Sequence, residues 1–195
     1  MYDLAILNGN VNIGDLSKSK ICNIGIRDSK ISYIGNDKIT ATKIIDANGY
    51  EVTPGFIDLH THSDLSFIID PDADSKLVQG VTFELMGNCG MSFCSPLSKD
   101  NKYQLQERLN RYGVSKNMDW NNFDDWLNEI QNNTPSINVA AQIGHGNLRS
   151  FVMGMEARHP TPYELDKMKE DLDNVKGELG EIKGLLSTLV QKLNN

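Results

Sequence analysis

The segment from Pro54 to Asp64 limits the fold most strongly, because its apolar run ends in two histidines one residue apart. Residues 55–60 are typical of a parallel strand that is buried on both faces. Alternate residues of a strand project from the same face, so His60 and His62 can point both imidazoles toward one divalent metal ion. Histidine pairs on surface loops are usually only polar residues. A buried strand end, where α/β barrels build their active sites, favours a metal site here.

Composition limits the class of protein. The chain has 195 residues, of which 39% are hydrophobic and 23% charged, as expected of one globular domain or of one domain with an appendage. No apolar run approaches the ~20 residues that span a bilayer, and the first residues lack the pattern of a signal peptide. We therefore expect no membrane partner and a cytoplasmic location. A net charge of -7 argues against a nucleic-acid partner.

Short β segments separated by turns fill residues 1–53. The strand-like stretches are residues 2–7, 11–13, 21–26, 31–35 and 43–47, and Asn8-Gly9 predicts a hairpin turn. We interpret this region as a β meander that forms a small sheet, a β-sandwich segment preceding the main domain.

Strands alternate with helices over residues 54–164. Residues 81–86 and 138–143 are predicted strands, residues 74–79 a short helix, and Glu84 is expected to make an internal polar contact. Phe123, Trp126, Leu127 and Ile130 have the spacing of an amphipathic helix. This order predicts βαβ units and a parallel sheet, so the fold class is α/β.

A heptad pattern occupies residues 165–195. Thr161, Pro162 and Glu164 predict a helix start with a capping box. The apolar residues that follow are spaced alternately by three and four: Leu165, Met168, Leu172, Val175, Leu179, Ile182, Leu186, Leu189 and Leu193. The pattern predicts a long helix with two alternative roles, self-association into a homo-oligomer as a coiled coil, or cover for the preceding domain.

Several motifs together resemble one enzyme family. They are the Pro54 to Asp64 segment, Gln79-Gly80-Val81-Thr82, Gly87-Asn88-Cys89-Gly90 and Gly144-His145-Gly146-Asn147-Leu148-Arg149. From residue 2 to about 168 the chain resembles the metal-dependent amidohydrolase superfamily, and within it the N-acyl-D-amino-acid deacylases, or D-aminoacylases. The resemblance implies a (β/α)₈ TIM barrel flanked by a β-sandwich. Isoaspartyl dipeptidase-like and dihydroorotase-like hydrolases are the alternatives within the superfamily.

The resemblance also implies a metal site. His60 and His62 match the histidines of the first barrel strand, and Cys89 matches a thiolate ligand after the second. Zinc accepts imidazole and thiolate together, although other first-row ions remain alternatives, as does a buried inert thiol at Cys89. The implied substrate is a small N-acyl-D-amino acid. His145 and Arg149 follow the third strand and are candidates for substrate contact, with local loop hydrogen bonds as the alternative.

Some parts that the resemblance implies have no match in this sequence. These are a catalytic aspartate late in the barrel and two further histidine ligands, and a complete barrel needs about 250 residues. We therefore expect an incomplete barrel with weak or no activity alone. The alternative is a non-catalytic metal-binding or self-assembling module.

Overall fold

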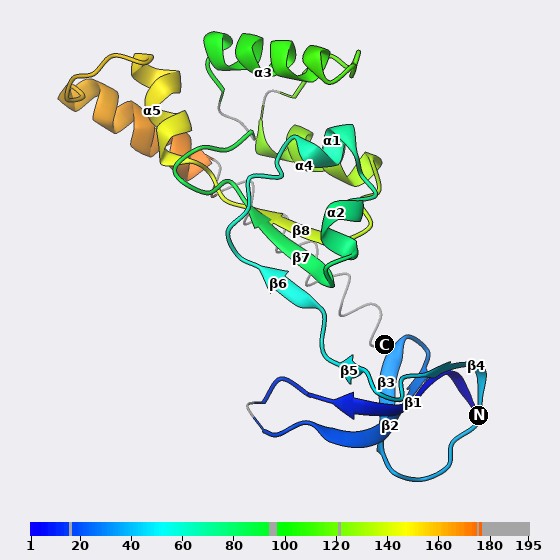
Figure 1. The fold of residues 1–195 in the computed structure, drawn as a ribbon. Helices are drawn as coiled ribbons and strands as arrows, with labels where there is room; N and C mark the ends of the chain where they lie inside the picture. Colours follow the sequence, from blue (N-terminus) through cyan, green and yellow to red (C-terminus); the bar gives the residue numbers. More distant parts are fainter. Residues whose placement is uncertain (16, 94–96, 121, 175, 177–195) are drawn as a thin grey trace, which may run out of the picture. The chain divides into compact units, whose positions relative to one another are not determined.

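The computed structural model describes residues 1–15, 17–93, 97–120, 122–174 and 176. The chain divides into two compact units, Met1–Gly55 and Phe56–Asn195. The first is all β, and the second is an α/β unit (Figure 1). No helix within the described residues is long and apolar enough to cross a membrane.

The first unit is one five-stranded sheet. Its strands are β1 (Tyr2–Val11), β2 (Lys20–Arg27), β3 (Lys30–Gly35), β4 (Ala41–Asp46) and β5 (Glu51–Val52). Their order is β3-β2-β1-β4, and β5 pairs with the end of β1. The meander prediction is correct only for β1 to β3, which pair antiparallel, because β4 and β5 both pair parallel to β1.

The predicted hairpin turn at Asn8-Gly9 is wrong. β1 continues through both residues. Its pairing with β2 passes from Ile6–Ile24 directly to Gly9–Cys22, so Leu7 and Asn8 lie opposite the single residue Asn23 and form a β-bulge. Asn8 takes a φ of 60°, and its N–H donates to Asn23 Oδ1 at 2.9 Å. The tight hairpin lies instead at Asp28 and Ser29, whose φ values of 51° and 58° suit a two-residue turn.

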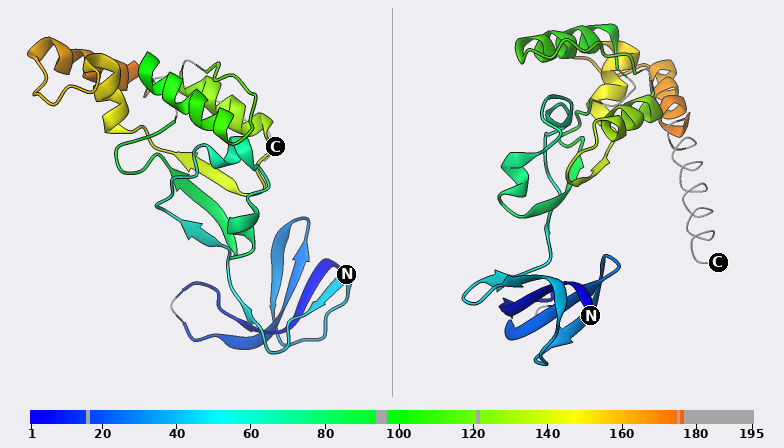
Figure 2. Two further views of the ribbon diagram at one scale, coloured as in Figure 1. Left: turned by 45° about the horizontal axis from the view of Figure 1, so that its top comes forward. Right: turned by 90° about the vertical axis from the view of Figure 1, so that its right-hand side faces the viewer.

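The second unit is built on a parallel sheet of β6 (Phe56–Asp58), β7 (Val81–Met86) and β8 (Asn138–Ala141), in that order. α1 (Ser66–Ile69) and α2 (Asp74–Leu77) connect the first pair of strands. α3 (Lys99–Arg111) and α4 (Phe123–Asn132) connect the second pair, and α5 (His145–Met153) follows β8. α1 lies against α4, and α2 packs on β7 (Figures 1 and 2).

The core of this unit lies between the sheet and its helices. Phe123, Trp126 and Ile130 of α4 are all buried, which confirms the predicted amphipathic stripe. β6 differs from its prediction, since Phe56 and Ile57 are 55% and 63% exposed rather than buried on both faces. The reason is that β6 is an edge strand of the described sheet, with β7 as its only partner there.

A further helix begins at residue 162 and is described to residue 174. Its capping box is confirmed: the Glu164 N–H donates to Thr161 Oγ1 at 3.2 Å, and the Thr161 N–H donates to Glu164 Oε2 at 2.7 Å. Met168 is buried against Leu148 and Met153, whereas Leu165 is 45% exposed. Most of the heptad pattern, residue 175 and residues 177–195, lies outside the described residues, so the predicted long helix and oligomer stay predictions.

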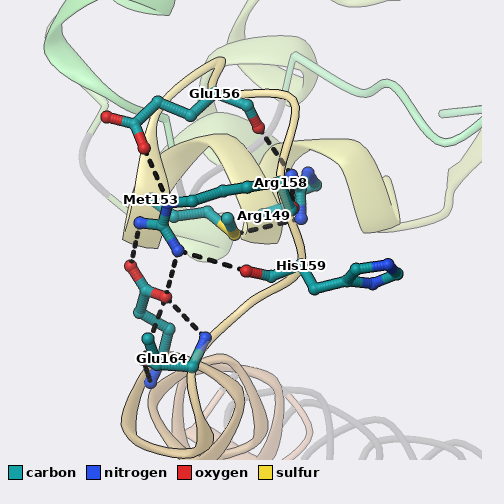
Figure 3. Close-up of polar contacts among 7 residues, drawn as sticks. Arg149, Met153, Glu156, Arg158, His159 and Glu164 are labelled. Atoms are coloured by element: carbon teal, nitrogen blue, oxygen red, sulfur yellow. Dashed lines mark hydrogen bonds and ion pairs between the residues drawn. The ribbon is translucent and has the colours of Figure 1, made fainter.

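An ion pair supports the start of this helix (Figure 3). Arg158 Nη1 and Nη2 donate to Glu164 Oε2 and Oε1 at 2.7 and 2.6 Å, and Arg158 Nε donates to Glu156 at 2.6 Å. The hydrogen bonds from Arg158, and then from the Thr161 N–H, lower the pKa of Glu164 from 4.5 to about 2. A lowered pKa means that the folded state favours the ionised carboxylate.

This shift predicts how the helix start responds to acid. The contribution of Glu164 to stability is fully present above pH 4.5 and is lost as the pH falls through about 2. A carbon-detected NMR titration of the Glu164 carboxyl group measures the midpoint directly. In Arg158→Gln we expect the midpoint to move up toward 4.5, and a midpoint already near 4.5 in the wild type would contradict the ion pair.

Candidate metal site

The three predicted ligands lie at the carboxyl ends of neighbouring strands. His60 and His62 are in the loop that follows β6, and Cys89 is in the loop that follows β7. The two strands are parallel, so both loops leave the same edge of the sheet. The histidines stand beyond the three residues of β6, so the loop rather than the strand pleat orients their rings.

The structure brings the three side chains together. One ligand atom from each of His60, His62 and Cys89 lies within 4.8 Å of the others. The distance from His60 Nε2 to Cys89 Sγ is 3.2 Å. The centroids of the His60 and His62 rings are 5.8 Å apart, and the ring planes are inclined at 65° to each other. The edge of a zinc tetrahedron with imidazole and thiolate ligands is about 3.5 Å. The donor set and the His60–Cys89 distance therefore fit zinc, and all three side chains are exposed to an incoming ion.

The backbone around Cys89 is unusual. Gly87, Cys89 and Gly90 have φ values of 77°, 54° and 75°, in the left-handed region that favours glycine. A Cβ at Gly87 would lie 2.0 Å from the Gln142 carbonyl oxygen, so only glycine fits there. For Cys89 this conformation costs about 1–2 kcal/mol, a strain that typically persists at functional sites.

Asn88 fixes this loop, and the sequence did not single out its side chain. Its amide nitrogen donates to the carbonyls of Thr61 at 3.2 Å and Leu85 at 2.8 Å, and its oxygen accepts from Gln142 Nε2 at 3.3 Å. These partners belong to the loop after β6, to β7 and to the loop after β8. One buried side chain therefore connects all three strand ends.

A second set of contacts connects the loop after β7 to α5. The Gly146 N–H donates to the Gly90 carbonyl at 2.7 Å, and a Cβ at Gly144 would lie 2.5 Å from that oxygen. Buried Asn147 accepts from the Ser92 N–H at 2.8 Å and donates to the Ser92 carbonyl at 2.6 Å. The glycines of the Gly144-His145-Gly146 motif thus permit a close approach of two backbones.

Two buried acidic groups belong to the same segments as the candidate ligands, Asp64 to the loop after β6 and Glu84 to β7. Asp64 is 1% exposed, and burial raises its pKa above the ordinary value, although Oδ1 accepts from the Phe93 N–H at 3.4 Å. Glu84 is fully buried and forms an ion pair with Lys76 at 2.8 Å, which confirms its expected internal polar contact. Lys76 also binds Asp58 at 3.0 Å. Burial opposes the charge on Lys76, but these polar contacts outweigh it and raise its pKa.

His145 and Arg149 are on α5. His145 is exposed at the first residue of the helix. Arg149 Nη2 donates to the carbonyls of Glu156 at 2.7 Å and Arg158 at 2.6 Å, and Nη1 lies 3.0 Å from Met153 Sδ (Figure 3). These are the local loop hydrogen bonds that stood as the alternative for Arg149. Substrate contact by His145 and Arg149 stays a prediction.

Comparison with known proteins identifies the family of this chain. The model of the amidohydrolase family matches residues 43–193. The chain belongs to the amidohydrolase family. This match extends past residue 168 and includes residues 165–193 of the heptad pattern.

Within this family, the chain is similar to deacylases of N-acyl-D-amino acids. D-aminoacylase from Alcaligenes xylosoxydans xylosoxydans is 32% identical over 87% of this chain and 34% of that protein. A second relative is N-acyl-D-glutamate deacylase from Bordetella bronchiseptica, whose crystal structure contains zinc and a phosphonate inhibitor. Its sequence is 32% identical and its TM-score is 0.74, over 89% of this chain and 36% of that chain. A structure of D-aminoacylase with a binuclear metal centre is 31% identical in sequence and has a TM-score of 0.76. The match covers 90% of this chain and 36% of that chain. The chain thus spans about a third of the length of these relatives.

The buried ion pair of this amidohydrolase chain predicts a stability effect. Lys76→Met leaves the fully buried Glu84 carboxylate without its cation. Removing one partner of a buried pair costs about 3–5 kcal/mol, and we expect about 3 kcal/mol because Lys76 itself is 27% exposed. Urea denaturation measures the free energy of unfolding. Lys76→Met combined with Glu84→Leu should recover most of the loss, and an unchanged midpoint in the single variant would contradict the account.

Proposed function

We propose that this chain forms part of a zinc-dependent amidohydrolase that hydrolyses the amide bond of N-acyl-D-amino acids. The observation that carries the proposal is the convergence of His60, His62 and Cys89 at one edge of a parallel sheet. Support also comes from the similarity to a D-aminoacylase and to two deacylases of acidic N-acyl-D-amino acids, at 32–33% identity.

The proposal includes the architecture of the whole enzyme. β6, β7 and β8 lie in sequential order with helices in each connection, which is the arrangement of successive strands in a (β/α)₈ barrel. We propose that they are the first three strands of such a barrel, with the Met1–Gly55 unit as its β-sandwich segment.

The roles of the residues follow from their chemistry. His60 and His62 would hold zinc through neutral imidazoles, and Cys89 would hold it as a thiolate, releasing its proton on binding. Zinc, when bound, activates water and polarises an acyl carbonyl. Asn88 positions both ligand loops, since its amide contacts the Thr61 carbonyl between the two histidines.

Zinc content and turnover test the proposal together. We expect near-stoichiometric zinc by elemental analysis in the wild type and its loss in Cys89→Ala, with Cys22→Ala of the first unit as the matched control. Metal-dependent release of free amino acid from N-acetyl-D-amino acids, and not from the L forms, would support the full proposal. Zinc binding without turnover would favour the non-catalytic metal-binding alternative. No zinc in a folded wild-type sample would contradict the proposal.

A further inference from the structure

A cavity of about 420 Å³ lies beside the candidate metal site. Its walls come from the loop after β7, from α3 and from α5, and His62 is part of the wall. This volume is within the range of small-molecule sites in proteins, about 300–1,000 Å³. A molecule bound here would therefore lie next to one of the proposed zinc ligands.

Most of the wall is apolar. The apolar side chains are Met91, Phe93, Leu97, Leu105 and Met155. Two of them face water, since Met91 is 67% exposed and Met155 is 82% exposed. An apolar group in the cavity would remove this surface from water, and flexible methionine side chains adapt to the shape of such a group.

Arg108 is the one fully charged side chain in this wall, which has no acidic residue among the described residues that line it. Arg108 is exposed, and among the described residues its guanidinium has no hydrogen bond or ion pair. It also lines a neighbouring cavity of about 260 Å³ that shares His62 and Phe93. A guanidinium without a partner beside an apolar wall suits a ligand that carries one carboxylate and one apolar group.

The two halves of an N-acyl amino acid differ in whether they carry a carboxylate beside a side chain. The amino-acid half carries both a carboxylate and a side chain on one carbon, whereas a simple acyl half carries neither. We propose that this cavity binds the amino-acid half of substrates with apolar side chains, and that Arg108 binds the α-carboxylate. The inference rests on the proposed function. An acidic side chain would bring a second carboxylate that has no cation in this wall, so acidic substrates bind more weakly.

Binding of matched ligands tests the role of Arg108. Ligand-observed NMR on the zinc-loaded chain measures Kd for N-acetyl-D-methionine, N-acetyl-D-glutamate and the uncharged N-acetyl-D-methionine amide. We expect the methionine acid to bind about tenfold more tightly than its amide, because the amide lacks the charge-assisted hydrogen bond to Arg108. We also expect it to bind more tightly than N-acetyl-D-glutamate, because the second carboxylate of glutamate would lose water without gaining a cation.

Two variants of α3 complete the experiment. Arg108→Gln should weaken binding of the methionine acid about tenfold and leave the amide unchanged. Lys99→Gln removes the same charge from the same helix at a residue outside the cavity wall, and should change neither ligand. Thermal unfolding confirms that both variants fold, as expected for exposed side chains.

The outcomes separate this inference from the proposed function. Equal Kd values for acid and amide, an unchanged Kd in Arg108→Gln, or no binding at millimolar ligand would overturn the inference. Release of acetate in the same spectra reports turnover independently. Turnover that is unaffected by Arg108→Gln would leave the proposed function intact, and Arg108-dependent binding without turnover would support the cavity alone.

Discussion

The hydrogen bonds of Asn88 hold together the loops after β6, β7 and β8, and the placement of the three proposed metal ligands depends on them. Thr61, whose carbonyl accepts from Asn88, lies between His60 and His62, and Cys89 follows Asn88 directly. The same amide therefore fixes the backbone from which the side chains of His60, His62 and Cys89 project. Because these side chains are themselves exposed, their mutual placement depends on buried polar contacts beneath them, as metal sites generally depend on their supporting residues.

Sequence patterns within a single segment correctly predicted the elements that depend on residues close together in the sequence. β7 has the predicted bounds, α4 buries the predicted stripe, and Thr161 and Glu164 form the predicted capping box. The proximity of His60, His62 and Cys89 was predictable because carboxyl ends of neighbouring parallel strands meet at one edge. Two errors have a common cause. The bulge at Asn8 and the exposure of β6 depend on which strands pair alongside, and neither is encoded within the segment itself.

The contacts that the sequence did not reveal connect distant residues. Asn147 and Ser92 are 55 positions apart, and Asn88 and Gln142 are 54 apart, so no periodic pattern links them. The cavity beside His62 has the same origin, since its wall draws on the loop after β7, on α3 and on α5. Its position next to the ligand cluster follows from the close approach of Gly146 to the Gly90 carbonyl, which brings α5 against that loop.

The most direct test of the account is the X-ray absorption spectrum of zinc bound to the chain, because it reports the ligand atoms themselves. The account predicts one sulfur at about 2.3 Å together with nitrogen ligands at about 2.0–2.1 Å. It also predicts that the sulfur disappears in Cys89→Ala. A zinc shell of nitrogen and oxygen alone in the wild type would contradict the assignment of Cys89, and with it the cluster on which the proposed function rests.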